Sequence, residues 1–455
     1  MVMLFNITII FSSNTEDEKF YSISGIISDE KNEPLSGVEI YLSQLNKVVK
    51  SNNKGKYKIS HLKPGTYSLL FFFQDYRQAI KEVEITDNNI NLSIELEEIN
   101  IELEEVEVLG KKRAINSGKN YLSAVENTAI YAAQKTEVAV VDEITANKAT
   151  NSARQIFAST TGIQIWESDG AGLQLGIGGR GLSPNRTANF NTRQNGYDIS
   201  ADALGYPESY YSPPMEAVEK IEIIRGAASI QYGPQFGGVV NFVMKKGRTD
   251  IPMEVISRST IGSFKLFNSF TSIGGTKGNF NYYAFYQNKS GNGWRDNSGF
   301  DVNTGYINLI YSIKDRISLS MDITVMDYIA QQAGGLTDKW FYYNPRQSIR
   351  NRNWFKVNWN MVAFTLDYNL TKKSKINWRT FGLAASRHAV GNLGKINRPD
   401  DNLERDLIAA NFNNYGSELR FLHKYKFIRE NQAFLLGARV YNGHSYSRQG
   451  YASSD

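Results

Sequence analysis

From about residue 252 to its C-terminus, the chain alternates apolar and polar side chains along stretches of ten or more residues. In residues 317–325 every odd position is apolar, and every even position is Ser, Asp or Thr. Residues 361–370 and 375–380 repeat the alternation on either side of a short polar segment. Because successive side chains of a β-strand point to opposite faces, this pattern predicts long strands with one apolar and one polar face.

About nine such strands are expected, joined alternately by tight turns and by long polar loops. This arrangement is typical of a transmembrane β-barrel, whose outer face meets lipid while its inner face is wet. Backbone groups in lipid must be bonded within the protein, so strands cross a bilayer only in a closed barrel. A soluble antiparallel sheet with one wet face is the alternative. The strand lengths, the loop asymmetry and the 26 Tyr and 24 Phe favour the barrel.

Residues 20–99 predict a separate small domain. Short segments of period-two alternation recur about every ten residues, separated by Gly, Asn and Pro, which is typical of a β-sandwich. Ahead of it, the apolar run of residues 4–11 is similar to the core of a secretory signal that lacks a basic start. Residues 1–19 are therefore a possible degenerate signal segment, and a first β-strand is the alternative.

Residues 115–247 predict an α+β domain. Short helices are expected between residues 141 and 161, with Gly162 as their stop. The segments "KIEIIRG" and "VVNFVMK" predict strands, and "AASIQYG" between them predicts a helical turn. Residues 100–114, in which an acidic stretch gives way abruptly to three basic residues, form the expected linker between this domain and the first one.

A G-x-G-x-x-G motif lies within this third region, at Gly176, Gly178 and Gly181, with Asp198 at the spacing of a ribose-binding carboxylate. A dinucleotide site needs a helix at the third glycine, because the helix N-terminus holds the pyrophosphate. Pro184 and a run of Asn and Gly follow instead, without a helical apolar stripe. We therefore expect the glycines to serve a tightly folded loop.

Composition excludes several kinds of site. There is no Cys, and the four His are scattered without the spacing of metal ligands. The net charge of +5 is too mild for a nucleic-acid partner, and no run of 18 apolar residues predicts a membrane-spanning helix. Without a G-x-S-x-G, a Walker motif or a convincing triad, we expect neither an enzyme nor a resident cofactor.

The glycine-rich region and the sequence "IRGAASIQYGPQFGGVVNFV", residues 224–243, resemble the plug domain of TonB-dependent outer-membrane receptors, with the ferric-citrate type as the most similar subgroup. The resemblance continues into the barrel at "SGNGWRDNSGF", residues 290–300, and covers residues 100–455. Residues 20–99 resemble the carboxypeptidase-regulatory-like β-sandwich that often precedes such receptors. The resemblance implies a mainly β protein of the cell outer membrane: a β-sandwich, a TonB-box linker at 100–114, a plug at 115–247 and the first part of a barrel at 248–455.

The segment "LEEVEVLGKKR" is similar to the family's TonB box, although Glu107 stands where a hydrophobic residue is usual. Its alternating side chains suit addition as a strand to the sheet edge of a TonB-type energy-coupling partner. An ordinary acidic linker is the alternative. The expected contact residues are Glu105, Val106, Glu107 and Val108.

The family resemblance also implies a ligand between the plug apices and the extracellular loops. Guanidinium groups bind carboxylates in pairs of hydrogen bonds, which suits an anionic iron chelate such as a siderophore or a ferric citrate-like ligand. The alternative is that each Arg pairs with a carboxylate of the plug or of the barrel wall. The candidate ligand-binding residues are Arg180, Ser183, Asn185, Arg186, Arg193 and Tyr206.

The family's barrels close with about 22 strands, and nine would leave no room for a plug. We therefore expect an incomplete, unclosed wall in a truncated receptor that does not transport alone. Residues 441–455 are expected in an extracellular loop. The overall prediction is active uptake of an iron chelate, with a TonB-type protein, the small ligand and outer-membrane lipid as partners. A receptor importing a glycan or peptide, or a secreted β-rich adhesion protein, is the alternative.

Overall fold

The computed structural model describes residues 20–97 and 119–452, apart from short gaps at 31, 46, 74–75, 77, 133–135, 159, 168, 234, 315, 401–402 and 428–431. The chain divides into two compact units, Met1–Lys111 and Lys112–Asp455. In the part of the chain that is described, no helix is long and apolar enough to span a membrane.

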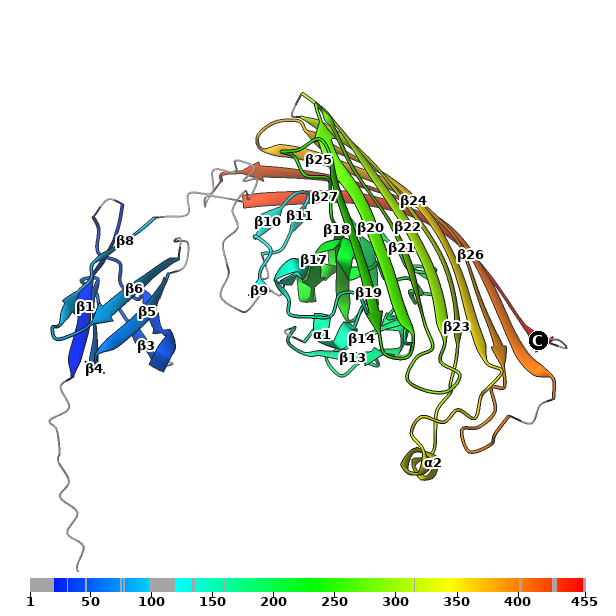
Figure 1. Ribbon diagram of the computed structural model, residues 1–455. Helices are drawn as coiled ribbons and strands as arrows, with labels where there is room; N and C mark the ends of the chain where they lie inside the picture. Colours follow the sequence, from blue (N-terminus) through cyan, green and yellow to red (C-terminus); the bar gives the residue numbers. More distant parts are fainter. Residues whose placement is uncertain are drawn as a thin grey trace, which may run out of the picture. The chain divides into compact units, whose positions relative to one another are not determined.

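The first unit is a β-sandwich of two four-stranded sheets, as predicted (Figure 1). Its interior is apolar: Ile23, Ile40, Leu69 and Phe71 are fully buried between the sheets. These residues lie at alternate positions of their strands, which is why the period-two pattern found the domain. One sheet contains β4 (Lys56–Leu62), β1 (Tyr21–Asp29), β7 (Ile90–Asn91) and β8 (Ile94–Leu96), and the other β3 (Lys47–Lys50), β2 (Glu39–Leu42), β5 (Gly65–Phe72) and β6 (Ala79–Ile85).

The second unit begins with an α+β domain, residues 119–247, which we call the plug. The short helices expected in residues 141–161 are η2 (Val141–Glu143) and α1 (Ala153–Ile156). The turn expected between two strands is η5 (Gly226–Tyr232). A six-stranded sheet forms its centre, in the order β16 (Tyr197–Asp198), β15 (Phe190–Gln194), β18 (Gly238–Met244), β17 (Val218–Ile224), β12 (Thr136–Val140) and β9 (Lys119–Asn120).

The rest of the unit is a nine-stranded antiparallel sheet, which we call the wall, and it curves around the plug (Figure 1). Each strand pairs with the next along the chain, and no pairing between the first and the last is found in the described residues. The expected nine strands are thus confirmed. They are β19 (Glu254–Gly262), β20 (Leu266–Lys277), β21 (Phe280–Gly291), β22 (Phe300–Ile313), β23 (Ile317–Gln331), β24 (Trp354–Asn369), β25 (Ser374–Gly391), β26 (Arg405–Tyr425) and β27 (Gln432–Ala452).

Burial along β23 shows the two faces of the wall. Leu319 and Val325 are 45% and 46% exposed on the outer face, whereas Asp322 and Thr324 are 2% and 0% exposed against the plug. Along residues 319–325 the alternation separates an apolar outer face from a polar inner one, as predicted. Farther along β23 the inner face is apolar or aromatic instead, and Met326, Tyr328 and Ala330 are buried in the core that the wall shares with the plug. Short turns join the strands at one end and longer loops at the other, among them the loop that carries α2 (Asp338–Tyr343) (Figure 1).

The expectation of a loop at residues 441–455 is wrong for most of that segment. Residues 441–452 continue β27, which runs for 21 residues and pairs along its length with β26. The segment is rich in Ser, Gly and Tyr, and so lacks the apolar face expected of a strand in lipid. A strand that extends into water does not need that face.

Candidate functional site at the plug–wall interface

The glycine motif lies on a two-stranded hairpin of the plug, β13 (Ile163–Glu167) and β14 (Leu175–Gly179). After Gly181, whose φ is +79°, only the three-residue turn η3 (Asn185–Thr187) follows, so no helix is available for a pyrophosphate. A Cβ on Gly178 would lie 2.3 Å from the carbonyl oxygen of Leu182. The glycines therefore permit a close backbone fold, as expected.

Three of the predicted ligand-binding residues follow this hairpin and are exposed: Arg180, Ser183 and Asn185. The hydroxyl of Ser183 accepts a hydrogen bond of 3.3 Å from the backbone N–H of Asn185. The carbonyl of Ser183 accepts one of 3.0 Å from the Asn189 amide. These contacts fix the backbone and leave the Arg180 side chain in solvent. The side chain of Arg186, which lies in η3, is outside the described part of the structure.

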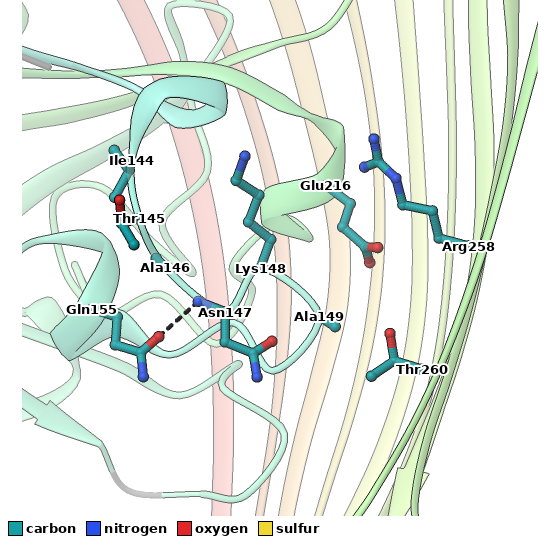
Figure 2. Close-up of a pocket in the computed structure, with 10 residues that line it drawn as sticks. All are labelled: Ile144, Thr145, Ala146, Asn147, Lys148, Ala149, Gln155, Glu216, Arg258 and Thr260. Atoms are coloured by element: carbon teal, nitrogen blue, oxygen red, sulfur yellow. Dashed lines mark hydrogen bonds between the residues drawn. The ribbon is translucent and has the colours of Figure 1, made fainter. Parts of the chain in front are cut away.

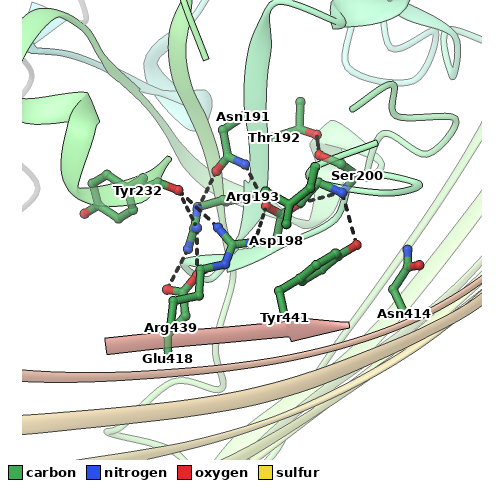
Figure 3. A network of polar contacts seen from close by, with 12 residues as sticks. Asn191, Thr192, Arg193, Asp198, Ser200, Tyr232, Asn414, Glu418, Arg439 and Tyr441 are labelled. Atoms are coloured by element: carbon green, nitrogen blue, oxygen red, sulfur yellow. Dashed lines mark hydrogen bonds and ion pairs between the residues drawn. The ribbon is translucent and has the colours of Figure 1, made fainter. Parts of the chain in front are cut away.

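Arg193 lies elsewhere, fully buried between the plug and the wall (Figure 3). Its guanidinium donates to both carboxylate oxygens of Glu418 in β26, at 2.8 and 3.0 Å. Its other N–H donors bond the Asn191 side chain and the carbonyls of Gly196 and Tyr232. All five donors are thus used within the protein. Burial acts to lower the pKa of Arg193, but Glu418 outweighs burial and the pKa is raised.

Arg193 therefore follows the alternative reading, in which an Arg pairs with a wall carboxylate. A second ion pair supports it: Arg439 of β27 bonds Asp198 at 3.2 Å and lies 3.5 Å from Glu418 (Figure 3). Asp198 also accepts a hydrogen bond of 2.6 Å from Asn191. Asp198, which stands at the ribose-binding spacing after the glycine motif, thus helps to join the plug to the wall. The sequence pattern placed Glu418 and Arg439 on strands but did not indicate these partners.

Tyr206 also lies at the plug–wall interface. Its hydroxyl accepts a hydrogen bond of 3.0 Å from Arg387 of β25 and lies 2.8 Å from the hydroxyl of Tyr210. Its ring stacks on Phe412 of β26, with 5.5 Å between the ring centroids. Like Arg193, it joins the plug to the wall.

A third contact places a buried amine and a buried carboxylate close together. Lys289 of β21 donates hydrogen bonds to the plug carbonyls of Thr150 and Ala171, at 2.9 and 2.5 Å. Asp169 of the plug accepts a hydrogen bond of 2.9 Å from the hydroxyl of Tyr328. Burial raises the pKa of Asp169 although Tyr328, two backbone N–H groups and Lys289 oppose the shift. Polar groups of both layers thus hold the plug.

A pocket of about 560 Å³ separates the plug from the first wall strand (Figure 2). Residues 144–149 form one side of it, and Arg258 and Thr260 of β19 form the other. Its buried carboxylate, Glu216, accepts a hydrogen bond of 3.0 Å from Asn268. With Lys148 also in the lining, the pocket has two cationic side chains and one anionic one. Among the described residues, no group of three or more His, Asp or Glu is arranged to hold a metal ion.

Comparisons with known proteins agree with this architecture. The sequence family described as TonB-dependent Receptor Plug Domain matches residues 129–240, and the family described as CarboxypepD_reg-like domain matches residues 23–108. The plug, the sandwich and the placement in the outer membrane that the sequence predicted are confirmed.

Several solved structures share the fold of most of the chain. The ferric citrate transporter FecA, unliganded, is 21% identical with a TM-score of 0.61, and the alignment covers 70% of this chain and 48% of that one. BauA, the ferric preacinetobactin receptor from Acinetobacter baumannii, is 12% identical with a TM-score of 0.59, covering 74% and 51%. The pyoverdine receptor FpvA from Pseudomonas aeruginosa PAO1 is 14% identical with a TM-score of 0.56, covering 69% and 46%. The chain thus spans about half the length of these structures.

Proposed function

We propose that this chain, with its TonB-dependent receptor plug domain held against a barrel-type wall, acts in the uptake of an anionic iron chelate through the outer membrane. The observation that carries the proposal is the exposed Arg180 on a plug loop whose backbone is fixed by Ser183 and Asn189. A solvated guanidinium on a rigid loop suits a carboxylate or hydroxamate oxygen of a chelate. The ferric citrate and siderophore receptors of the same fold support this class of cargo.

The proposed binding group is Arg180 with Ser183, Asn185 and Arg186. Arg193 and Tyr206 hold the plug in the wall, so a chelate would have to displace Glu418 or Arg387 to reach them. The other residues need no such displacement. In this proposal the plug binds the cargo and then opens a path for it through the wall.

The second part of the proposal concerns energy coupling. Residues Glu105–Val108, which lie outside the described residues, are proposed to add as a strand to a TonB-type partner. The described chain resumes at β9, which pairs with β12 through only two residue pairs. A pull on the linker would reach this short edge strand first. Few backbone hydrogen bonds resist there, so the sheet is proposed to open from β9 inward.

The experiment measures chelate binding by the purified chain. Ferric citrate and a ferric hydroxamate are titrated by calorimetry, with a neutral oligosaccharide as the competing cargo class. Arg180→Ala should weaken binding of the ferric chelate about tenfold, as the loss of one charge-assisted hydrogen bond predicts. Arg248→Ala is the matched control, since Arg248 is an exposed arginine between the plug and β19 and is paired with Asp250.

Three outcomes would overturn the proposal or the site assigned in it. Binding of the oligosaccharide without any binding of a ferric chelate would assign a glycan-importing receptor instead. If the protein were found in the culture medium and not in the membrane fraction, it would be assigned as a secreted adhesion protein. Equal loss of chelate affinity in both arginine variants would remove the assigned site.

A further inference from the structure

The outer face of the wall carries an apolar groove of about 500 Å³. It crosses β21 to β25 near the ends that the short turns join. Its position on the outer face follows from the register: Leu319 is opposite Leu366, which is opposite Trp378, and all three alternate with residues of the inner face. The apolar part of the lining is completed by Phe280, Leu309, Tyr311, Met321 and Phe364.

Two polar groups of the groove, on Trp378 and Thr380, are bonded within the protein. The indole N–H of Trp378 donates a hydrogen bond of 2.9 Å to the hydroxyl of Ser417. The hydroxyl of Thr380 lies 3.1 Å from that of Tyr415. The groove therefore offers hydrocarbon contacts, and its volume lies in the range of sites for small ligands, about 300–1,000 Å³.

Basic side chains surround the turns at the end of the groove. Five basic side chains are exposed there, and no carboxylate partner is found for them in the described structure. They are Lys277, Lys314, Arg316, Lys372 and Lys373. These turns contain a single acidic residue in the sequence, Asp315, which is outside the described residues. Lys314 and Arg316 are three residues from the groove residues Tyr311 and Leu319, or about 10 Å along a strand.

We propose that the groove binds one acyl chain of an anionic phospholipid, whose phosphate is held by the basic turns. Short turns mark the periplasmic end of such walls, so the lipid belongs to the inner leaflet of the outer membrane. Juxtamembrane Lys and Arg attract anionic headgroups, whereas a zwitterionic headgroup would leave them uncompensated. The inference requires the wall to face lipid and is independent of the cargo.

The test compares lipid binding by the full chain, purified from membranes in mild detergent. Phosphatidylglycerol and phosphatidylethanolamine of equal chain length are titrated and bound lipid is counted by native mass spectrometry. The basic residues of the turns form a rim at the end of the groove. A variant that neutralises three of these charges, the rim variant, carries Arg316→Gln, Lys372→Gln and Lys373→Gln. Its affinity for phosphatidylglycerol should fall at least about tenfold, with phosphatidylethanolamine unaffected.

Two further variants separate the headgroup from the groove. The control carries Lys265→Gln, Lys339→Gln and Lys395→Gln, which remove three exposed charges at the long-loop end, and it should bind like the wild type. Thr380→Phe fills the groove, keeps the basic rim, and should also lose bound lipid. Equal affinity of the wild type for both lipids, full retention by the rim variant, or an equal loss in the control would each overturn the proposal.

Discussion

Arg193 of the plug and Glu418 of the wall share two hydrogen bonds of 2.8 and 3.0 Å, although 225 positions separate them in the sequence. Their side chains are 0% and 4% exposed, so both charges are removed from water. Such a pair contributes little net stability compared with apolar residues of the same volume, but the loss of one partner leaves the other charge buried and unpaired. The pair therefore specifies how the plug sits in the wall.

Glu418→Gln should loosen the plug, because it leaves Arg193 without its carboxylate. The expected loss is about 3–5 kcal/mol of stability. It should appear as faster hydrogen exchange in residues 190–198 and as earlier proteolysis of the plug on heating. Glu254→Gln, which removes a surface partner of Arg248, should cost less than about 1 kcal/mol. Equal effects of the two substitutions would contradict this account.

Gly178→Ala and Gly181→Ala should destabilise the plug for different reasons. The added Cβ at Gly178 meets the Leu182 carbonyl oxygen, and the backbone must move, at a cost of about 1–3 kcal/mol. At Gly181 there is open space, but its φ of +79° costs an alanine about 1–2 kcal/mol. Gly181→Asn should thus recover much of the loss, whereas Gly178→Asn should not. Thermal unfolding of the four variants measures both effects.

Arg258→Glu should slow the passage of an anionic chelate if the cargo moves through the pocket between residues 144–149 and β19. The substitution places a second carboxylate opposite Glu216, so the anion meets a repulsive lining. In a receptor whose wall is completed by further strands, we expect a lower maximal uptake rate with an unchanged affinity at the binding step. Arg258→Lys keeps the charge and should transport normally. A change in binding affinity without a change in rate would place the path elsewhere.

The contribution of Asp142 should depend on pH. Partial burial acts to raise the pKa of its carboxyl, but Lys245 and Lys148, at 3.1 and 3.3 Å, outweigh burial and hold the pKa below its ordinary value. A carboxyl whose pKa is lowered by folding stabilises the fold above its unfolded pKa, and this stabilisation is lost as the pH falls through the folded value.

Asp142→Asn should accordingly lower the melting temperature at pH 7, and the effect should disappear as the pH falls through the folded-state pKa. The effect at pH 7 should stay under about 1 kcal/mol, because the side chain is 60% exposed and water screens the ion pairs. Melting curves over a series of pH values measure it, with the neighbouring Glu143→Gln as a control that should change stability little.

Local patterns predicted the strands, because side-chain alternation is a property of consecutive residues. They gave the nine wall strands, the sandwich, and the plug strands on either side of "AASIQYG". The pairing of Arg193 with Glu418 lies beyond such patterns: alternation assigns Glu418 to the inner face but not to a particular plug residue. The loop expected at residues 441–452 is wrong because the polar composition of this segment shows no apolar face, and a strand outside lipid needs none. The TonB-box residues Glu105–Val108 and the ligand group at Arg180 remain predictions.

The two longest strands, β26 and β27, have 21 residues each, against 14 in β22. At about 3.4 Å per residue they extend for roughly 70 Å, whereas the apolar band of such walls is about 25 Å tall. Because the tight turns at the other end hold the strands level, the surplus projects past the membrane on the side of the long loops. There the two paired strands extend the wall above the cell surface.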